Sequence, residues 1–210
     1  ISYLVSLVVG YFEVVRDEWR GIPVEYYVER GKGKDARPSM GKTPAMIEFF
    51  SNYLDYPYPY EKYAQVAVRY FTAGGMEHTT ATTMFEGIVM DESARLDTDM
   101  EGLIMHELAH QWFGDLVTCE SWPHLWLNEG FATLSDALWD EHTKGKDAYL
   151  DAILDRMEGY IGESHSYTRA LVTNQFEDAG EMFDGHSYPK GACVLHMLRN
   201  QLGDNLFRQS

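Results

Sequence analysis

The pattern in this 210-residue sequence that could most directly do chemistry is a pair of histidines with a glutamate between them. His106, Glu107 and His110 lie in the stretch LIMHELAHQWFG. On a helix, side chains four positions apart leave the same face, so the two imidazoles can bind one metal ion. Two histidines at this spacing suit Zn²⁺, and Glu107 would lie beside the ion, where a base for a water molecule is needed.

A catalytic zinc site needs a third protein ligand and one open coordination position. Glu129 follows His110 after 18 intervening residues, within LWLNEGFATL, which we expect on the next helix. The short connection 114–125 would let that helix fold back antiparallel to the first. Apolar neighbours place the histidine helix inside the molecule, where two imidazoles and two carboxylates without a metal would be costly. A metal site is therefore favoured over ordinary packed histidines.

These stretches resemble the zinc aminopeptidase family of aminopeptidase N and leukotriene hydrolase, which are gluzincins with a thermolysin-like catalytic domain. The family has HExxH, then 18 residues, then Glu, in runs similar to HELAHQWFG (106–114) and LWLNEGFAT (125–133). The resemblance implies one Zn²⁺ per chain and makes Glu107 the general base that activates the zinc-bound water. The implied zinc ligands are His106, His110 and Glu129.

A tyrosine near the end of the chain carries a second resemblance. The family places a tyrosine before a helix with a KGA-type start, and Tyr188-Pro189-Lys190-Gly191-Ala192 matches that pattern. The resemblance implies that the Tyr188 hydroxyl donates to the oxyanion of the tetrahedral intermediate. Without the family, a tyrosine in a loop before proline would be interpreted as a packing residue.

The stretch AGGMEHTTATTM at 73–84 is interpreted as an edge strand with one unexpected charge. The family carries a Gly-x-Met-Glu-Asn signature upstream of HExxH, on an edge strand of the active-site cleft. The glycines permit close backbone approach, so an extended substrate can pair with the strand. The matching substrate-binding residues are Gly74, Gly75, Met76, Glu77 and His78.

Within this signature, Glu77 would accept the free α-ammonium group of the substrate, which explains cleavage at N-terminal residues. From composition alone, Glu77 would instead be a charge on a solvated edge strand. His78 stands where the family has Asn, and we expect a structural or substrate-lining role for it. A role as a further zinc ligand is disfavoured, because three protein ligands are already assigned.

Asp136 lies two helical turns after Glu129, on the same predicted helix face. Histidines that bind a metal usually donate their second ring nitrogen to a carboxylate or carbonyl. We therefore predict that Asp136 supports His106 or His110. A solvated helix aspartate is the alternative.

The elements that must position these residues follow from periodicity and turn signals. Strands come first and helices after, which predicts an α+β fold with a small mixed sheet followed by a mainly helical part. In chain order we expect strands within 1–30, a polar loop at 31–41, a helix at 43–54, a half-buried strand at 63–71, a capped helix at 98–114, helices at about 126–143, 147–162 and 189–202, and a loop-rich stretch at 163–188.

The first residues, ISYLVSLVVGYFEVV, could be mistaken for a signal peptide, but they have no basic region and are too short to span a membrane. We interpret them as a strand. By resemblance, residues 1–15 are the end of a β-rich N-terminal domain and residues 16–210 are the catalytic domain, truncated at both ends. We expect a soluble protein without a targeting segment in this stretch, and the compartment stays unassigned.

Composition excludes some partners. The net charge is −16 with 17 Lys and Arg, which argues against nucleic acid and anionic membranes, since both need clustered cations. Cys119 and Cys193 form no disulfide framework and are expected as free thiols. The expected partners are peptides with a free N-terminus, and the sequence does not set the oligomeric state.

Three functions are consistent with these patterns. The first is a zinc aminopeptidase that hydrolyses the N-terminal peptide bond. The second is a related zinc hydrolase with another substrate, similar to the leukotriene hydrolase branch that opens epoxides. The third is a non-catalytic scaffold, which would be free to lose Glu107, a ligand or Tyr188. None of these is lost, so the scaffold is disfavoured.

Overall fold

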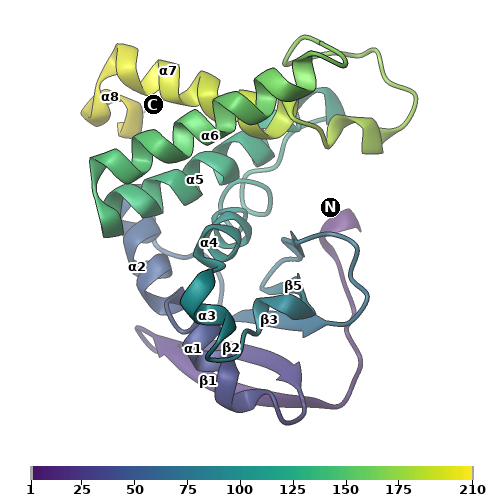
Figure 1. The fold of residues 1–210 in the computed structure, drawn as a ribbon, viewed down its shortest axis with the longest axis vertical. Helices are drawn as coiled ribbons and strands as arrows, with labels where there is room; N and C mark the ends of the chain where they lie inside the picture. Colours follow the sequence, from purple (N-terminus) through teal and green to yellow (C-terminus); the bar gives the residue numbers. More distant parts are fainter. Residues whose placement is uncertain (1, 210) are drawn as a thin grey trace. The chain divides into compact units, whose positions relative to one another are not determined.

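The computed structural model describes residues 2–209. The first half of the chain contains a five-stranded mixed sheet (Figure 1). The strands lie in the order β1-β2-β3-β5-β4. β1 and β2 form an antiparallel hairpin, β2–β3 and β3–β5 are parallel, and β4 runs antiparallel to β5 at the edge of the sheet. Their bounds are β1 Phe12–Trp19, β2 Ile22–Glu29, β3 Tyr63–Val68, β4 Gly75–Met76 and β5 Ala81–Phe85.

The central strand β3 is more buried than its sequence suggests. We predicted alternating exposure at 63–71, but every side chain from Tyr63 to Ala67 is buried. Even Gln65 is inside, where its amide oxygen accepts a hydrogen bond from Thr43 at 3.1 Å. A strand with parallel neighbours on both sides is covered on both faces, which removes the polar alternation of an exposed sheet.

Four helices belong to the same half of the chain: α1 Gly33–Met40, α2 Thr43–Tyr53, α3 Ala94–Asp97 and α4 Glu101–Ala109. The predicted loop at 31–41 is wrong, because α1 occupies most of it. Ala36 and Met40, four residues apart, are fully buried there, and this packing outweighs the glycines and Pro38 that suggested a loop. Helix α4 is shorter than the predicted helix at 98–114. At its first residue, the backbone N–H of Glu101 donates a hydrogen bond to the Asp99 carboxylate at 3.0 Å.

The second half of the chain is helical, and its main helix is α5. Ala132 and Ala137 of α5 are fully buried, and α5 packs against α6 and α7. The predicted helices after residue 126 are confirmed, and the chain turns between the first two at Gly145 with φ +99°. Their bounds are α5 Trp126–Lys144, α6 Lys146–Ser164, α7 Gly191–Leu202 and α8 Asp204–Gln209. Three short turns accompany them: η3 Trp122–His124, η4 Ala179–Met182 and the π-helical η5 His186–Lys190.

The two halves are compact units, the first ending at Gln111 and the second beginning at Trp112. Together they give the α+β fold that the sequence predicts, a small mixed sheet followed by a mainly helical part. The strand predicted through the first eleven residues is wrong for the described ones. Residues 2–4 form one 3₁₀ turn and residues 5–10 have no regular structure, while Ile1 lies outside the described residues. High β-propensity does not make a strand where no partner strand is present.

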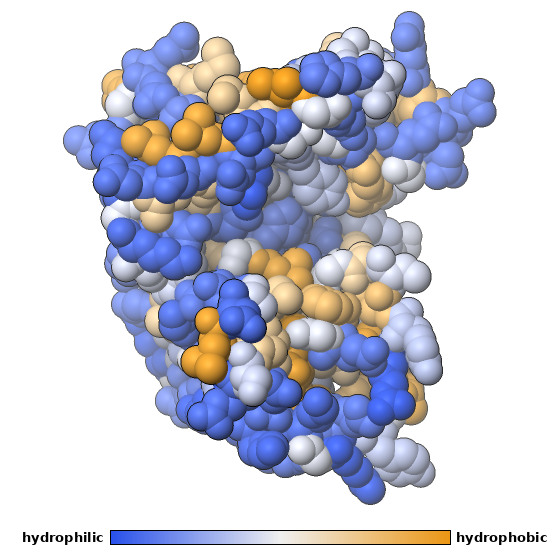
Figure 2. Space-filling model, in the orientation of Figure 1, coloured by the Kyte–Doolittle hydropathy of each residue, from blue (hydrophilic) through white to orange (hydrophobic). Residues whose placement is uncertain are grey.

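Hydrophilic side chains cover most of the visible face of the molecule (Figure 2). This agrees with the strongly negative net charge. Among the described residues, no helix combines the length and apolar character that crossing a membrane requires.

Candidate functional site

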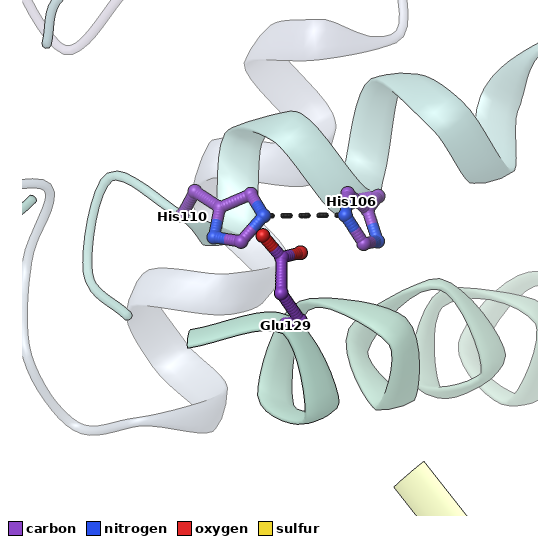
Figure 3. Close-up of side chains that lie close together, drawn as sticks. All are labelled: His106, His110 and Glu129. Atoms are coloured by element: carbon purple, nitrogen blue, oxygen red, sulfur yellow. Dashed lines mark hydrogen bonds between the residues drawn. The ribbon is translucent and has the colours of Figure 1, made fainter. Parts of the chain in front are cut away.

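The two histidines lie one turn apart at the end of α4, and their Nε2 atoms are 3.2 Å apart (Figure 3). The ring planes are nearly perpendicular, with centroids 4.8 Å apart. Two nitrogens that bind one tetrahedral zinc at about 2.0–2.1 Å lie roughly 3.3 Å from each other. The spacing between His106 and His110 therefore fits two ligands of a single zinc ion.

Glu129 lies in the first turn of α5 and is 2% exposed. One ligand atom from each of His106, His110 and Glu129 lies within 4.8 Å of the other two (Figure 3). Two imidazole nitrogens and one carboxylate oxygen are a typical donor set for a catalytic zinc site. These residues thus form a group that could hold a metal ion.

Glu107, the predicted base, is 4% exposed and packs against the edge strand β4. A Cβ atom added at Gly75 would overlap the Glu107 carboxyl group. The missing side chain at Gly75 therefore lets the backbone of β4 lie directly against Glu107. The sequence suggested close approach of a substrate at this glycine, and the structure shows close approach of the Glu107 side chain.

Glu77 follows β4 and is only 5% exposed, so the solvated alternative is wrong. Within the described part of the chain, its carboxylate has no hydrogen-bond or ion-pair partner. A buried carboxylate is costly unless an opposite charge or donors compensate it. A ligand with a cationic group would supply that compensation.

His78 lies next to Glu77, and its Nδ1 is 2.9 Å from the Thr83 hydroxyl of β5. Burial lowers the pKa of His78, while the neighbouring Glu77 acts in the opposite direction. The ring is thus a neutral polar group bonded to the sheet. A structural or substrate-lining role for His78 stays a prediction.

Gln111 is a buried residue that the sequence reasoning did not single out. It is fully buried; its amide nitrogen donates to the Glu77 carbonyl at 3.2 Å, and its amide oxygen accepts from the Thr80 backbone at 2.9 Å. Gln111 directly follows His110, so it ties the segment after β4 to the end of the histidine helix. The one feature of the sequence that could have indicated its role is a side-chain amide between His110 and the aromatic residues Trp112 and Phe113.

Tyr188 lies in η5, which continues into α7. Where α7 begins, its backbone touches that of α5, since a Cβ atom at Gly130 would lie 3.1 Å from the Gly191 backbone. Gly130 directly follows Glu129, and Gly191 comes three residues after Tyr188. Contact between the two helices therefore fixes the positions of Glu129, the predicted third ligand, and Tyr188, the predicted oxyanion donor, in the second unit.

Comparison with known sequences identifies the family. The model for the peptidase family M1 domain matches residues 39–210. The chain belongs to peptidase family M1. It is 36% identical to aminopeptidase M1 of Arabidopsis thaliana over 222 residues and 35% identical to human endoplasmic reticulum aminopeptidase 1 over 216 residues. These alignments cover 100% and 99% of this chain but 25% and 23% of the relatives, so the chain spans about a quarter of their length.

In this M1 chain, Asp136 is 8% exposed and accepts a hydrogen bond from Arg156 of α6 at 2.7 Å. It is therefore not the solvated helix aspartate of the alternative interpretation. Arg156 was not predicted, because its partner lies 20 residues earlier and no local pattern links them. Support of a zinc histidine by Asp136 stays a prediction.

A second group of possible metal ligands in the M1 chain consists of Glu163, Asp184 and His186. Arg169 forms two hydrogen bonds with the Asp184 carboxylate, at 2.7 and 2.6 Å. The backbone N–H of Arg169 also donates to Nε2 of His186 at 3.0 Å. A guanidinium group already pairs with the Asp184 carboxylate of this cluster, so we interpret the cluster as a structural charge network.

Proposed function

We propose that this M1 chain is the catalytic part of a zinc aminopeptidase that hydrolyses the N-terminal peptide bond of peptides. One arrangement carries the proposal. A buried helix presents two imidazole nitrogens 3.2 Å apart, and Glu107 of that helix packs against the strand that leads into Glu77. The names of the relatives, which are aminopeptidases, support the same activity.

His106, His110 and Glu129 would hold one Zn²⁺ per chain. Their donor set and the separation of the two Nε2 atoms support this assignment. When bound, the ion polarises the scissile carbonyl and acidifies a water molecule. Asp136 would support one of the histidines through a hydrogen bond.

Glu107 is the proposed general base. It would take a proton from the attacking water and pass it to the nitrogen of the leaving amine. Its burial and its packing against Gly75 restrict where its carboxylate can lie. Tyr188 would donate its hydroxyl to the oxyanion that forms on the substrate carbonyl.

Glu77 is the proposed anchor for the substrate's α-ammonium group. The Glu77 carboxylate is buried and has no partner in the part of the chain that the structure describes, so a cation that arrives with the substrate would stabilise it. A free α-ammonium group is present only at the N-terminus of a peptide, so this contact would limit cleavage to the first residue. Gly74, Gly75 and Met76 would align the extended substrate along β4, with His78 lining its end.

The domain assignment goes with this proposal. Residues 16–210 would form the catalytic domain, and residues 1–15 would be the end of a preceding β-rich domain. The proposed partners are peptides with a free N-terminus.

An assay of aminoacyl-coumarin substrates, free and N-acetylated, tests the proposal on the purified protein with and without a chelator. We expect release of coumarin from the free substrates only, loss of activity with the chelator, and recovery on addition of Zn²⁺. Equal cleavage of acetylated substrates would contradict the aminopeptidase. Absence of peptide hydrolysis by the zinc-loaded protein would favour an epoxide-opening relative or a scaffold.

A further inference from the structure

The turn that carries Tyr188 has little support of its own. η5 is a single π-helical turn, His186–Lys190, and π-helical turns are rare and occur mostly at functional sites. Pro189 follows Tyr188 and has no backbone N–H to donate within the turn. The orientation of Tyr188 therefore depends on contacts from outside the turn.

Asp184 supplies the first of these contacts. One of its carboxylate oxygens accepts the backbone N–H groups of His186 and Ser187 at 3.1 and 3.0 Å. Its backbone carbonyl accepts the N–H of Tyr188 at 3.2 Å. Asp184 thus holds the entrance of the turn through three successive residues.

Arg169 supplies the second contact and fixes Asp184 in place. Its guanidinium donates to both oxygens of Asp184 and to the Ser187 hydroxyl, the latter at 3.0 Å. The side chains of Arg169 and Asp184 are 11% and 10% exposed. The two-pronged geometry of arginine at a carboxylate sets an orientation as well as a charge.

The backbone of Arg169 reaches both ends of the turn. Its N–H donates to Nε2 of His186 at 3.0 Å, and its carbonyl accepts from Nζ of Lys190 at 2.8 Å. Arg169 thus contacts the first and last residues of η5 as well as Ser187. An isolated ion pair on the surface contributes little to stability, whereas these contacts together restrain the whole turn.

We infer that Arg169 and Asp184 are positioning residues that hold η5, and with it the Tyr188 hydroxyl, in the orientation that oxyanion stabilisation requires. The inference rests on the proposed function of Tyr188. Neither residue touches the substrate in this account. Both act through the backbone of the turn.

Substitution of Arg169 tests the inference in the zinc-loaded protein. Arg169→Lys keeps the charge but loses the two-pronged contact, and we expect kcat to fall by about 10- to 100-fold, as for a misplaced catalytic group. KM should change little, because the hydroxyl acts in the transition state. Affinity for a phosphonate peptide that mimics the tetrahedral intermediate should fall by a similar factor.

A double substitution separates positioning from general stability. Tyr188→Phe alone should lower kcat by about 10²–10³-fold. In that background, Arg169→Lys should cost little more, because the group that it positions is absent. If the loss of kcat in the double variant equals the product of the losses in the two single variants, the inference is overturned.

Arg199→Lys is the matched control. Arg199 is a buried arginine of the same unit, paired with Glu141 at 2.8 Å and with Asp204 at 2.7 Å. Among residues 2–209, none of its hydrogen bonds or ion pairs goes to η5. We expect it to lower Tm while kcat is retained. Equal losses of kcat in Arg199→Lys and Arg169→Lys would overturn the inference.

The design keeps the two proposals distinguishable. If Tyr188→Phe retains kcat, the role of the tyrosine falls and this inference falls with it. If Tyr188→Phe loses kcat while Arg169→Lys retains it, only the inference falls. Should Arg169→Lys fail to fold, Ser187→Ala removes one guanidinium contact without breaking the ion pair, and kcat must still fall with zinc content unchanged.

Discussion

Glu77 and Asp184 are both shielded carboxylates, but their surroundings differ. Asp184 accepts hydrogen bonds from the Arg169 guanidinium, the Tyr167 hydroxyl and two backbone N–H groups. Glu77 has none from its side chain among the described residues. A carboxylate can accept about four hydrogen bonds, so one is filled by the protein and the other is open to a ligand. The difference separates a group that holds structure from a group suited to binding.

The largest effect should come from a third carboxylate, Glu107, which would change protonation during the proposed reaction. Glu107→Gln preserves shape but removes the base, so we expect kcat to fall by about 10²–10⁴-fold. Bound zinc, measured by metal analysis, should stay at one per chain. Near-normal hydrolysis by this variant would contradict the assignment of Glu107 as the base.

Glu77→Gln tests the open member of the pair. We expect kcat/KM for free aminoacyl substrates to fall by about 30-fold or more, as for loss of one partner of a buried charge pair. Because the variant removes a buried charge without a partner, Tm should stay the same or rise. A matched series of free and acetylated substrates gives the readout. Equal loss on both series would remove the amine-binding role.

Asp184→Asn tests the filled member and should have the opposite effect on stability. The variant leaves Arg169 without its anionic partner, and we expect the free energy of unfolding to fall by about 1.5–3 kcal/mol. Urea denaturation of this variant and of Glu77→Gln under the same conditions makes the comparison direct. If both substitutions shift stability in the same direction, the distinction between the two carboxylates fails.

The sequence predicts those features of the fold and the site that depend on residues close together in the chain, and it misses those that depend on distant residues. The proximity of His106 and His110 follows from helical spacing alone, and the fold class follows from the order of strands and helices. Arg169 and Gln111 were not found, because their partners lie 15 and 34 residues away and no periodicity relates them. The helix α1 was missed because burial of its apolar face decides it, and burial is a property of the folded chain.

The smallest effect concerns pH and His186, which is fully buried. Burial lowers the pKa of His186, and Lys190 and Arg169 lower it further, against Asp184 and Glu163. The hydrogen bond from the Arg169 N–H also requires an unprotonated Nε2. The unfolded chain takes up a proton near pH 6.5, about the ordinary histidine value, whereas the folded chain resists it. The contribution of His186 to the free energy of unfolding should therefore be constant above that pH and fall as the pH drops below it.

Urea unfolding at several pH values between 7.5 and 5 measures this effect in the wild type and in His186→Asn. The variant has no imidazole at this position, so its stability should depend less on pH in that range. Parallel curves for the two proteins would show that His186 contributes nothing to the pH dependence.

The contact between Gly130 and Gly191 has a further consequence for motion and for evolution. Because the backbones of α5 and α7 touch without an intervening side chain, thermal displacement of one helix is transmitted to the other. We therefore expect Glu129 and Tyr188 to move together, so that their separation varies less than the position of either one. If one glycine is replaced by a larger residue, the other position cannot make room, because glycine is already the smallest residue. Both positions should thus tolerate substitution poorly, although neither glycine takes part in the chemistry.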